Sequence, residues 1–401
     1  MSCLATILIA ARDAGSTIER AVESACAQGD YPILLIDDFS SDDTVLLACA
    51  VAGRRLQVVR PGVHKTVGIT RQAGLMALDT PYGVWLDADD QLLPGRLDGM
   101  IEALEYSPAD IVSDGAELFD GPTGEYRQPL PIPNFLLNRN PVARLFERNY
   151  LPAPGAIGFR TDFAKRIGYD PELNGAEDYD FLLRAIGANA RVCFLESSGY
   201  RLYAYPQSLS RKIENQWQMT GIALSKHSYQ DVRNLYNQAG YDDRIASWGL
   251  VSMAMYRSDY RAALEFIAQA EQIIVDPSAV LEPDGPMPYP EGWRAAFFKA
   301  TALLLLNRPK EAHPIFEFLM DGPPSAVVCN NFGVTKWKTG DQDGAERLFE
   351  QSIQLFPGYF DAQINLESAT PNRITTHPLR TGPARMDYSS ASKRISRSRP
   401  C

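Results

Sequence analysis

The chain has 401 residues, of which 45% are hydrophobic, so it is long enough for two domains with cores of their own. Its formal net charge of -10 argues against general nucleic-acid binding, which needs a basic surface. No stretch approaches about 18 consecutive apolar residues, and the N-terminus has no basic region before its short apolar run. We therefore expect neither a transmembrane helix nor a signal peptide, and membrane contact that is peripheral at most.

The N-terminal part of the chain alternates between apolar strands and helical segments. Strands are predicted over ATILIAA, YPILLIDD, RLQVVR and GVWLD, and helices over residues 15–27, 42–50, 67–79 and 95–106. Ser40 or Ser41 is expected to cap the second helix. Continuous apolar strands that alternate with helices predict a mostly parallel sheet covered on both faces. Ligands of such α/β sheets bind at the carboxyl ends of the strands.

Two of these strands end in acidic residues, which are expected to face one crevice. Asp38 follows one strand, and Asp87, Asp89 and Asp90 end the other, in the motif LDADD. Crowded carboxylates are stable only if they are solvated, paired with a cation or protonated. Mg²⁺ and Mn²⁺ take one or two protein carboxylates and complete their shell with phosphate and water. An isolated Asp-x-Asp is more often a solvated loop, but here a second acidic strand end accompanies it.

The rest of the chain is less uniform. Residues 115–155 are rich in proline and turn residues and are predicted to be irregular, and AIGFR reads as a short strand. A helix is predicted to begin at Glu177 and Asp178, since acids are stabilised at a helix N-terminus. After about residue 215 we expect long helices without clear strands. The six cysteines form no Cys-x-x-Cys pair, which favours a reducing, cytoplasmic setting.

The helical half contains a repeat with a step of 33 residues, read from the pairs Ala312 and Ala345, and Phe316 and Phe349. This pattern resembles the tetratricopeptide repeat. We therefore predict an α/β domain over residues 1–214 and a helical repeat domain over residues 215–367. Residues 368–401, with seven Lys and Arg and one Asp, are predicted to form a disordered basic tail.

Five motifs in order resemble those of family 2 glycosyltransferases with the GT-A fold. They are ATILIAARDAGSTIERAVESACAQ, ILLIDDFSSDDT, GITRQAGLMAL, VWLDADDQLLP and GAEDYDFLLRA, spread over roughly residues 4–210. The resemblance implies a nucleotide-sugar-binding domain. It also implies inverting transfer of a sugar from a nucleotide-diphosphate sugar, a UDP-sugar by default, with Mn²⁺ or Mg²⁺ as cofactor.

The resemblance also implies residue roles. Asp178 would be the general base, with Glu177 beside it, and Asp89 would hold the metal. The donor-binding residues would be Ala10, Ala11 and Asp13 around the nucleoside, Asp38 at the base, Asp87 at the ribose, and Arg71 and Arg211 near the diphosphate. For Arg71 a helix-surface ion pair is an equally good interpretation, and for Glu177 and Asp178 the alternative is stabilisation of the helix N-terminus.

Several positions depart from the family pattern. Arg12 and Asp13 replace the usual aromatic and amide residues after the first strand, Phe39 replaces a small residue, and Gln72 replaces a frequent Asn. Tyr203 stands where many members carry a histidine that binds the metal. Tyrosine is a poor Mg²⁺ ligand at neutral pH because it must first lose a proton.

The sequence lacks the motifs of several other function classes. The chain has no Gly-x-Ser-x-Gly, no His-Glu-x-x-His and no Gly-x-Gly-x-x-Gly after its first strand, which argues against hydrolase, zinc-protease and Rossmann oxidoreductase functions. One alternative remains, because Tyr203 replaces the usual histidine: the N-terminal domain would be catalytically inactive and would act as a binding platform. The repeats would bind a protein or peptide acceptor, or would only pack on the catalytic domain or form a dimer contact. A glycan or lipid-linked acceptor is equally compatible with the sequence.

Overall fold

The computed structural model describes residues 4–138, 142–153, 155–205, 213–272 and 291–376, which form two compact units. The first unit comprises residues 1–145, 149–210 and 214–227. The second comprises residues 146–148, 211–213 and 228–401. We predicted a boundary at residue 214, whereas nearly all of helix α8 (Ile213–Ser225) lies in the first unit.

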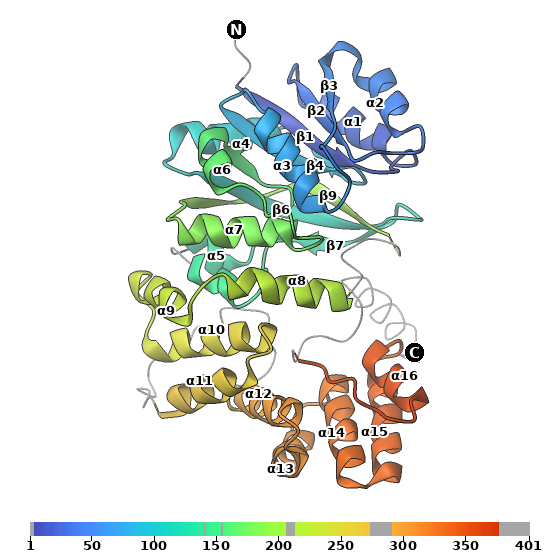
Figure 1. The fold of residues 1–401 in the computed structure, drawn as a ribbon, viewed down its shortest axis with the longest axis vertical. Helices are drawn as coiled ribbons and strands as arrows, with labels where there is room; N and C mark the ends of the chain where they lie inside the picture. Colours follow the sequence, from blue (N-terminus) through green and yellow to red (C-terminus); the bar gives the residue numbers. More distant parts are fainter. Residues whose placement is uncertain (1–3, 139–141, 154, 206–212, 273–290, 377–401) are drawn as a thin grey trace, which may run out of the picture. The chain divides into compact units, whose positions relative to one another are not determined.

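The first unit is built on a nine-stranded mixed sheet with the order β3-β2-β1-β4-β8-β6-β9-β5, in which β7 pairs with β6 (Figure 1). The strands are β1 Ala5–Ala11, β2 Ile33–Asp37, β3 Leu56–Val59, β4 Tyr82–Asp87, β5 Gln91–Leu92, β6 Ile111–Asp120, β7 Tyr126–Leu130, β8 Gly158–Arg160 and β9 Val192–Ala204. Strands β3, β2, β1 and β4 run parallel to one another, as do β6 and β9, whereas β8 is antiparallel to both of its neighbours. The predicted α/β sheet of the N-terminal part is confirmed.

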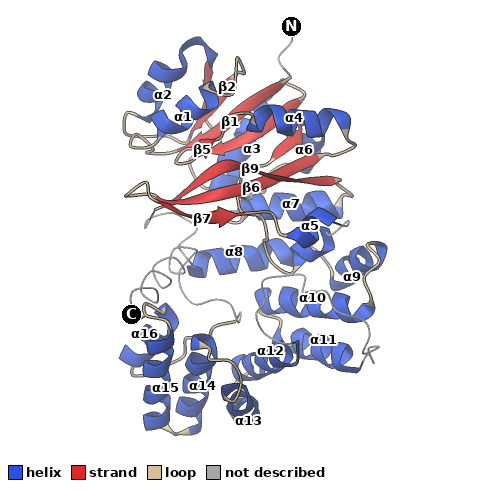
Figure 2. Ribbon diagram, turned by 180° about the vertical axis from the view of Figure 1, so that it is seen from behind, coloured by secondary structure: helices blue, strands red, loops and turns tan. Residues whose placement is uncertain are grey.

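Helices cover both faces of this sheet. They are α1 Ile18–Cys26, α2 Thr44–Ala52, α3 Val67–Ala77, α4 Arg96–Tyr106, α5 Asn134–Asn138, α6 Thr161–Ile167 and α7 Glu177–Gly187, with 3-10 turns at Gly53–Arg55 and Val142–Phe146. Helix α1 buries Ile18, Val22 and Ala25 at helical spacing, and these side chains join the same core as Ile7 of β1 and Met100 of α4. The face that carries α4 is seen in Figure 2, and the face with α3, α6 and α7 in Figure 1.

The predicted irregularity of residues 115–155 is wrong for its first part, where β6 runs on to Asp120 and returns as β7. Polar residues obscure this strand in the sequence, because β6 buries Ser113 and Asp114 along with its apolar residues. The carboxylate of Asp114 is buried because it pairs with Arg96 at 2.8 Å. A strand that buries an ion pair loses the continuous apolar pattern by which the other strands were found.

The second unit is helical in the residues that the structure describes. Its helices are α9 Tyr229–Gln238, α10 Asp243–Tyr256, α11 Tyr260–Gln272, α12 Glu291–Leu305, α13 Pro309–Met320, α14 Ala326–Thr339, α15 Gln342–Leu355 and α16 Phe360–Glu367. Successive helices pack as pairs, α10 with α11, α12 with α13 and α14 with α15. Within the described ranges, no helix combines the length and the apolar character that a membrane crossing requires.

The repeat positions are the contact points of these helix pairs. Ala312 of α13 and Ala345 of α15 are both fully buried. At Gly333 of α14 an added Cβ would lie only 2.5 Å from the ring of Phe349. A small residue is therefore required there for the two helices to approach, which explains the small and aromatic positions of the repeat.

The prediction of a disordered tail from residue 368 is wrong for its first nine residues, 368–376. Thr375 is fully buried, and asparagine side chains of α14 and α16 bind the main chain of Arg373 and Thr375. Composition gave no sign of this contact, because it is made through main-chain atoms that every sequence carries. Residues 377–401 lie outside the described residues.

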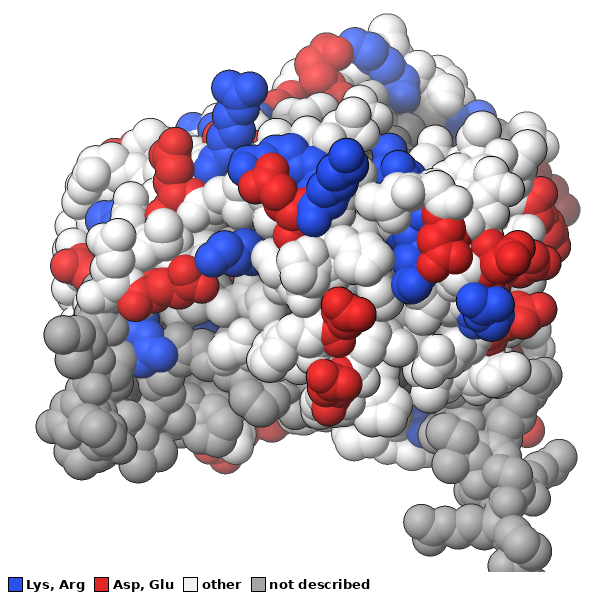
Figure 3. Space-filling model, turned by 90° about the horizontal axis from the view of Figure 1, so that it is seen from below, with Lys and Arg blue, Asp and Glu red and all other residues white. Residues whose placement is uncertain are grey.

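Charge is mixed on the surface that faces the viewer in Figure 3. Lys and Arg side chains there are interspersed with Asp and Glu side chains. This face therefore presents no broad field of one sign among its described residues.

Candidate active site

The carboxyl ends of β1, β2 and β4 lie side by side at one edge of the sheet. In the sheet register Ala10 of β1 is opposite Asp87 of β4, and Ala11 is opposite Asp37 of β2. The main-chain N–H of Asp38 donates to the carbonyl of Ala11 at 2.9 Å. The acidic ends of two strands therefore flank the end of β1, whose two alanines add little bulk between them.

Asp13 follows β1 and is held by the loop after β2. Its φ of 47° lies in the left-handed region, which Asp adopts more readily than most residues. Its carboxylate accepts hydrogen bonds from the main-chain N–H and the hydroxyl of Ser41, at 2.7 and 3.0 Å, and these bonds lower its pKa. Ser40 accepts from the N–H of Asp13 at 3.0 Å. The predicted cap by Ser40 or Ser41 is wrong: the N-cap residue of α2 is Asp43, which makes no side-chain cap bond, and Asp42 before it accepts from the N–H of Thr44 at 3.1 Å.

Asp38 is held by His64 through one of its two carboxylate oxygens. Its side chain is buried, with the residue only 7% exposed, and its Oδ2 lies 2.7 Å from Nδ1 of His64. Arg12 contacts the same imidazole ring. Among the described residues, Oδ1 of Asp38 has no hydrogen-bond partner and is buried. A buried acceptor without a donor is costly, so an N–H group of a ligand would be stabilised there.

Arg71 of α3 connects two acidic residues from different elements. Its Nη2 lies 2.8 Å from Asp87 Oδ1 and its Nε lies 3.0 Å from Glu177 Oε1, while Nη1 donates to the carbonyl of Gly155 at 3.1 Å. Burial alone would lower the pKa of Arg71, but the carboxylates of Asp87 and Glu177 outweigh it and hold that pKa above its ordinary value. Arg71 is only 5% exposed, so the interpretation as a helix-surface ion pair is wrong.

Gly155 marks a small space bordered by the side chains of Arg71, Asp87 and Asp178. A Cβ at this position would lie 2.6 Å from Arg71 Nη2, 3.3 Å from Asp87 Oδ2 and 3.4 Å from Asp178 Oδ2. The two carboxylates that the sequence placed 91 positions apart therefore face the same point. Only a residue without a side chain leaves that point open.

The carboxylates of Glu177 and Asp178 are presented by an unusual turn before α7. Gly175 and Ala176 both have positive φ, 123° and 55°, and the second value is rare for a residue with a Cβ. Helix α8 packs on this turn: Asn215 donates to the carbonyl of Asn174 at 2.8 Å, and its Nδ2 lies 3.0 Å from the point that a Cβ at Gly175 would occupy. The α8 helix, predicted to open the repeat domain, thus supports the acidic turn.

Burial dominates the electrostatics of this turn. Burial, the neighbouring Asp178 and the more distant Asp87 raise the pKa of Glu177 to about 7, against the opposing effect of Arg71. The pKa of Asp178 is also raised, chiefly by burial and against the effect of Arg71. A raised pKa makes a carboxylate a stronger base, which favours the proton uptake that a general base requires.

The acidic residues of the LDADD motif differ in their surroundings. Burial and the charge of Asp87 raise the pKa of Asp89 to about 6. Asp90, by contrast, accepts a hydrogen bond from the N–H of Tyr203 at 2.7 Å and so joins the turn to β9. The hydroxyl of Tyr203 bonds Gln91 at 2.6 Å, and Arg20 lies 3.7 Å over its ring. Tyr203 is therefore engaged in packing and hydrogen bonds within the domain.

The donor set fits a divalent metal that arrives with phosphate. No group of three His, Cys, Asp or Glu side chains suited to a metal occurs in the part of the chain that the structure describes. Asp87 is available at the crevice, since its side chain is 37% exposed and its Oδ2 is turned toward the space at Gly155. Asp89 is near enough for the charge of Asp87 to raise its pKa. Mg²⁺ and Mn²⁺ are commonly held by one or two carboxylates plus substrate phosphates. Arg211, predicted near the diphosphate, lies outside the described residues.

Residues 6–168 match the family model described as Glycosyl transferase family 2. This part of the chain is similar to a family 2 glycosyltransferase domain. The matched range contains Asp38, Arg71, Asp87 and Asp89 and ends before Glu177. The resemblance to this family that we read from the sequence is supported over residues 6–168.

Two curated relatives come from Rhizobium meliloti. The chain is 30% identical over 227 residues to the succinoglycan biosynthesis protein ExoO, which covers 51% of this chain and 62% of that protein. It is 29% identical over 228 residues to the succinoglycan biosynthesis protein ExoU, which covers 51% and 63%. The chain thus spans less than two thirds of the length of these relatives. The crystal structure of S. aureus TarS 1-349 with UDP-GlcNAc is 12% identical, with a TM-score of 0.48 over 89% of this chain and 93% of that one.

Three residues of the glycosyltransferase domain were not found from the sequence. His64 contacts Asp38, and Arg20 lies over the ring of Tyr203. Gly155 borders the space between Asp87 and Asp178. None of the three belongs to a recognisable sequence motif, because each contacts residues that are distant in the chain. The glycine in LPAPGAIG could have indicated a close approach of side chains, but proline and glycine are common in this stretch and do not single it out.

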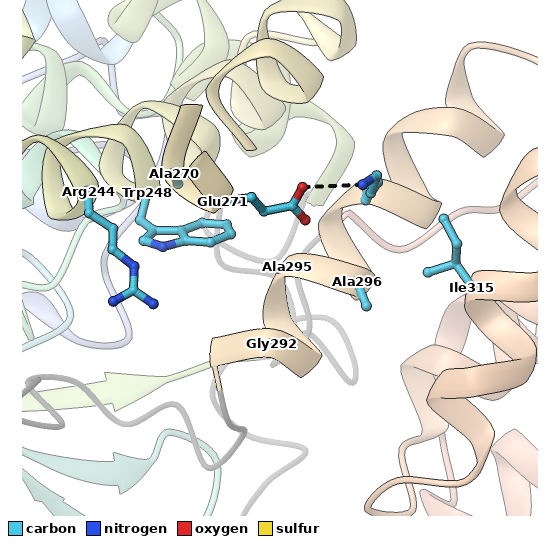
Figure 4. Close-up of a pocket in the computed structure, with 9 residues that line it drawn as sticks. Arg244, Trp248, Ala270, Glu271, Gly292, Ala295, Ala296 and Ile315 are labelled. Atoms are coloured by element: carbon cyan, nitrogen blue, oxygen red, sulfur yellow. Dashed lines mark hydrogen bonds and ion pairs between the residues drawn. The ribbon is translucent and has the colours of Figure 1, made fainter. Parts of the chain in front are cut away.

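A separate pocket lies in the second unit and shares no residue with the acidic crevice. It has a volume of about 380 Å³ and is bordered by α10, α11, α12 and α13 (Figure 4). Trp248, Ala295 and Ile315 supply apolar surface, and Lys299 and Glu271 form an ion pair of 3.4 Å at its edge. The chemistry expected of the chain lies instead with the carboxylates of the glycosyltransferase domain.

Proposed function

We propose that the chain is an inverting glycosyltransferase that moves a sugar from a nucleotide-diphosphate sugar, a UDP-sugar by default, to a hydroxyl group. The observation that supports this most strongly is the Arg71 bridge. It ties the end of β4, at Asp87, to the N-terminus of α7, at Glu177, so that Asp178 and Asp87 face one space at Gly155. A donor site and a base beside it are what such a transfer requires.

Donor binding follows from the strand ends. The free Oδ1 of Asp38 would accept from an N–H of the base, and Asp13 with Ala10 and Ala11 would border the nucleoside. Asp87 would meet the ribose. Arg71 already binds three protein acceptors, so we propose that it positions Asp87 and Glu177 and does not bind the diphosphate itself.

In the transfer step Asp178 would take the proton of the acceptor hydroxyl as that oxygen attacks the anomeric carbon. The bond from this carbon to the diphosphate breaks, and the electron pair leaves with the diphosphate. A positioned base contributes about 10²–10⁴-fold to such a rate. A divalent metal held by Asp89, with Asp87 nearby, would supply positive charge for the leaving diphosphate. Glu177 would hold Arg71, and with it the geometry of the site.

The acceptor is proposed to be a hydroxyl of a glycan or of a protein. The two relatives named for succinoglycan biosynthesis support a glycan. The paired helices of the second unit support a tetratricopeptide-like region that would hold a protein. We further propose a cytoplasmic site of action, which is supported by the free thiols of Cys26, Cys49, Cys193 and Cys329. The inactive alternative rested on Tyr203, and no observation favours it.

The proposal is tested by calorimetric titration of the protein with a panel of nucleoside diphosphates, with Mn²⁺ and with EDTA. We expect one nucleotide to bind in a metal-dependent manner, and Asp89→Asn to remove that dependence. Asp178→Asn should keep nucleotide binding and lose transfer or donor hydrolysis. Asp79→Asn is the matched control, since Asp79 is exposed before the opposite end of β4. Absence of binding by every nucleotide, in a folded protein, would refute the proposal.

A further inference from the structure

Three asparagine side chains in the second unit bind the main chain of residues 373–375. Asn365 of α16 donates to the carbonyl of Arg373 at 2.8 Å and accepts from its N–H at 2.8 Å. Asn331 of α14 makes the same pair of bonds with Thr375, both at 2.8 Å. Asn330 adds a second donor to the carbonyl of Arg373 at 2.9 Å. Each bidentate amide satisfies both main-chain groups of one residue, as a neighbouring β-strand would.

The two bidentate asparagines occupy matching places in α14 and α16, which α15 separates in the chain. The N-cap residues of α14 and α16 are Ser325 and Tyr359, and Asn331 and Asn365 each lie the same number of positions beyond their cap. Their ligands, Arg373 and Thr375, are alternate residues and so lie on one side of an extended chain. At the 33-residue step before Asn330 and Asn331, α12 carries Phe297 and Phe298. The amide site is therefore special to the last helices and is not a general feature of the repeat.

One side chain of the bound segment is also recognised. The hydroxyl of Thr375 donates to Asp361 at 2.7 Å and contacts the hydroxyl of Tyr359. Thr375 is fully buried, so this pocket has room for a small hydroxyl side chain and excludes a large or charged one. The bidentate amides bind main-chain atoms, while Ile374 packs against the apolar core of the unit and the Arg373 guanidinium lies 5.9 Å from the centre of the Phe360 ring.

We propose that α14 and α16 form a binding site for an extended polypeptide with Thr or Ser at the position of Thr375, and that residues 373–375 occupy it as an internal ligand that such a segment of another protein displaces. The inference does not depend on glycosyl transfer. The bidentate contacts are polar, so water can satisfy these amides when the segment leaves. Ile374 also packs against the apolar core of this unit, so displacement exposes some apolar surface. Attachment through a few residues after α16 gives the internal segment an effective concentration on the order of mM.

The internal segment must be weakened before a competing peptide can be measured. Thr375→Pro in the full chain removes the N–H that Asn331 accepts and the hydroxyl that binds Asp361. Asn372→Pro is the matched control, because Asn372 is exposed and makes no hydrogen bond that the structure gives within its described residues. The probe is a fluorescent peptide with the sequence of residues 369–376, and the readout is anisotropy.

We expect the peptide to bind the Thr375→Pro protein at least about tenfold more tightly than the wild type or Asn372→Pro protein. Adding Asn331→Ala to the Thr375→Pro protein, or methylating the peptide at the Thr375 nitrogen, should abolish this gain. A folded Thr375→Pro protein that binds no peptide at mM concentration would overturn the proposal and leave residues 368–376 as a fixed cap of the helices. Equal affinity for the methylated and the unmethylated peptide would overturn the proposal as well.

Two further outcomes are decisive. If Thr375→Pro does not fold, hydrogen exchange of the wild type replaces it: the amides of Arg373 and Thr375 should open well before those of α14, and opening only with global unfolding would refute displacement. If the wild type forms a dimer that Asn331→Ala abolishes, the site belongs to the segment of a second copy, and the proposed foreign partner is wrong.

Discussion

Arg71 and Asp87 form an ion pair in which Nη2 and Oδ1 are 2.8 Å apart, and the Arg71 side chain is only 6% exposed. The same guanidinium holds Glu177 at 3.0 Å. One residue of α3 therefore joins the end of a central strand to the start of α7. The positions of the acids on both elements depend on it.

Arg71→Gln is expected to destabilise the fold by about 3 kcal/mol, because it leaves the buried Glu177 and part-buried Asp87 without their cation. Urea unfolding measures the loss, and nucleotide titration should show weaker binding in the remaining folded protein. Arg191→Gln is the control. Arg191 is 61% exposed in its pair with Asp110, so about 1 kcal/mol or less is expected there. Equal losses from the two variants would contradict the bridge.

Gly155→Ala is expected to impair donor binding and transfer while the fold persists. The added Cβ would lie 2.6 Å from Arg71 Nη2 and would occupy the space between Asp87 and Asp178, so these side chains must move. A shift of this kind costs typically 1–3 kcal/mol, or about 10–100-fold in affinity or rate. Gly99→Ala on α4 serves as control, since a Cβ there meets nothing within 4 Å. Unchanged kinetics in Gly155→Ala would mean that the space is not used.

The stability of the protein should fall as pH rises from about 4.5 to about 7, in part because of Glu177. Burial raises the pKa of this carboxyl from 4.5 to about 7, so the folded state binds more protons than the unfolded state in that window. The stabilisation is fully present below pH 4.5 and is lost as pH passes 7. Glu177→Gln should flatten this slope in urea midpoints taken at pH 5 and pH 8. Glu105→Gln, at an exposed position of α4, should leave it unchanged.

Tyr203→Phe is expected to leave metal-dependent nucleotide binding unchanged. Its hydroxyl bonds Gln91 at 2.6 Å, so its removal should cost about 1 kcal/mol of stability and no metal affinity. Titration with Mn²⁺ and with EDTA, beside thermal unfolding, separates the two effects. Loss of the Mn²⁺ dependence in a folded Tyr203→Phe protein would show instead that the phenol takes part in metal binding.

Local patterns in the sequence predicted the elements that carry the site. Apolar runs of β1, β2 and β4 ending in small or acidic residues were enough to place Ala10, Asp38 and Asp87 at one sheet edge. This works because parallel strands share the direction in which they end. The same reasoning failed for β6, where the Arg96–Asp114 pair interrupts the apolar pattern.

The sequence by itself determined the alternation of strands and helices, the order of the acidic motifs and the repeat, because each depends on residues a few positions apart or on a fixed step. Only the tertiary structure decided that Arg71 binds Glu177 across 106 positions, that His64 holds Asp38, and that Asn331 binds Thr375. These contacts join segments that are distant in the chain. They depend on how whole elements pack, and no local pattern of side chains records that packing.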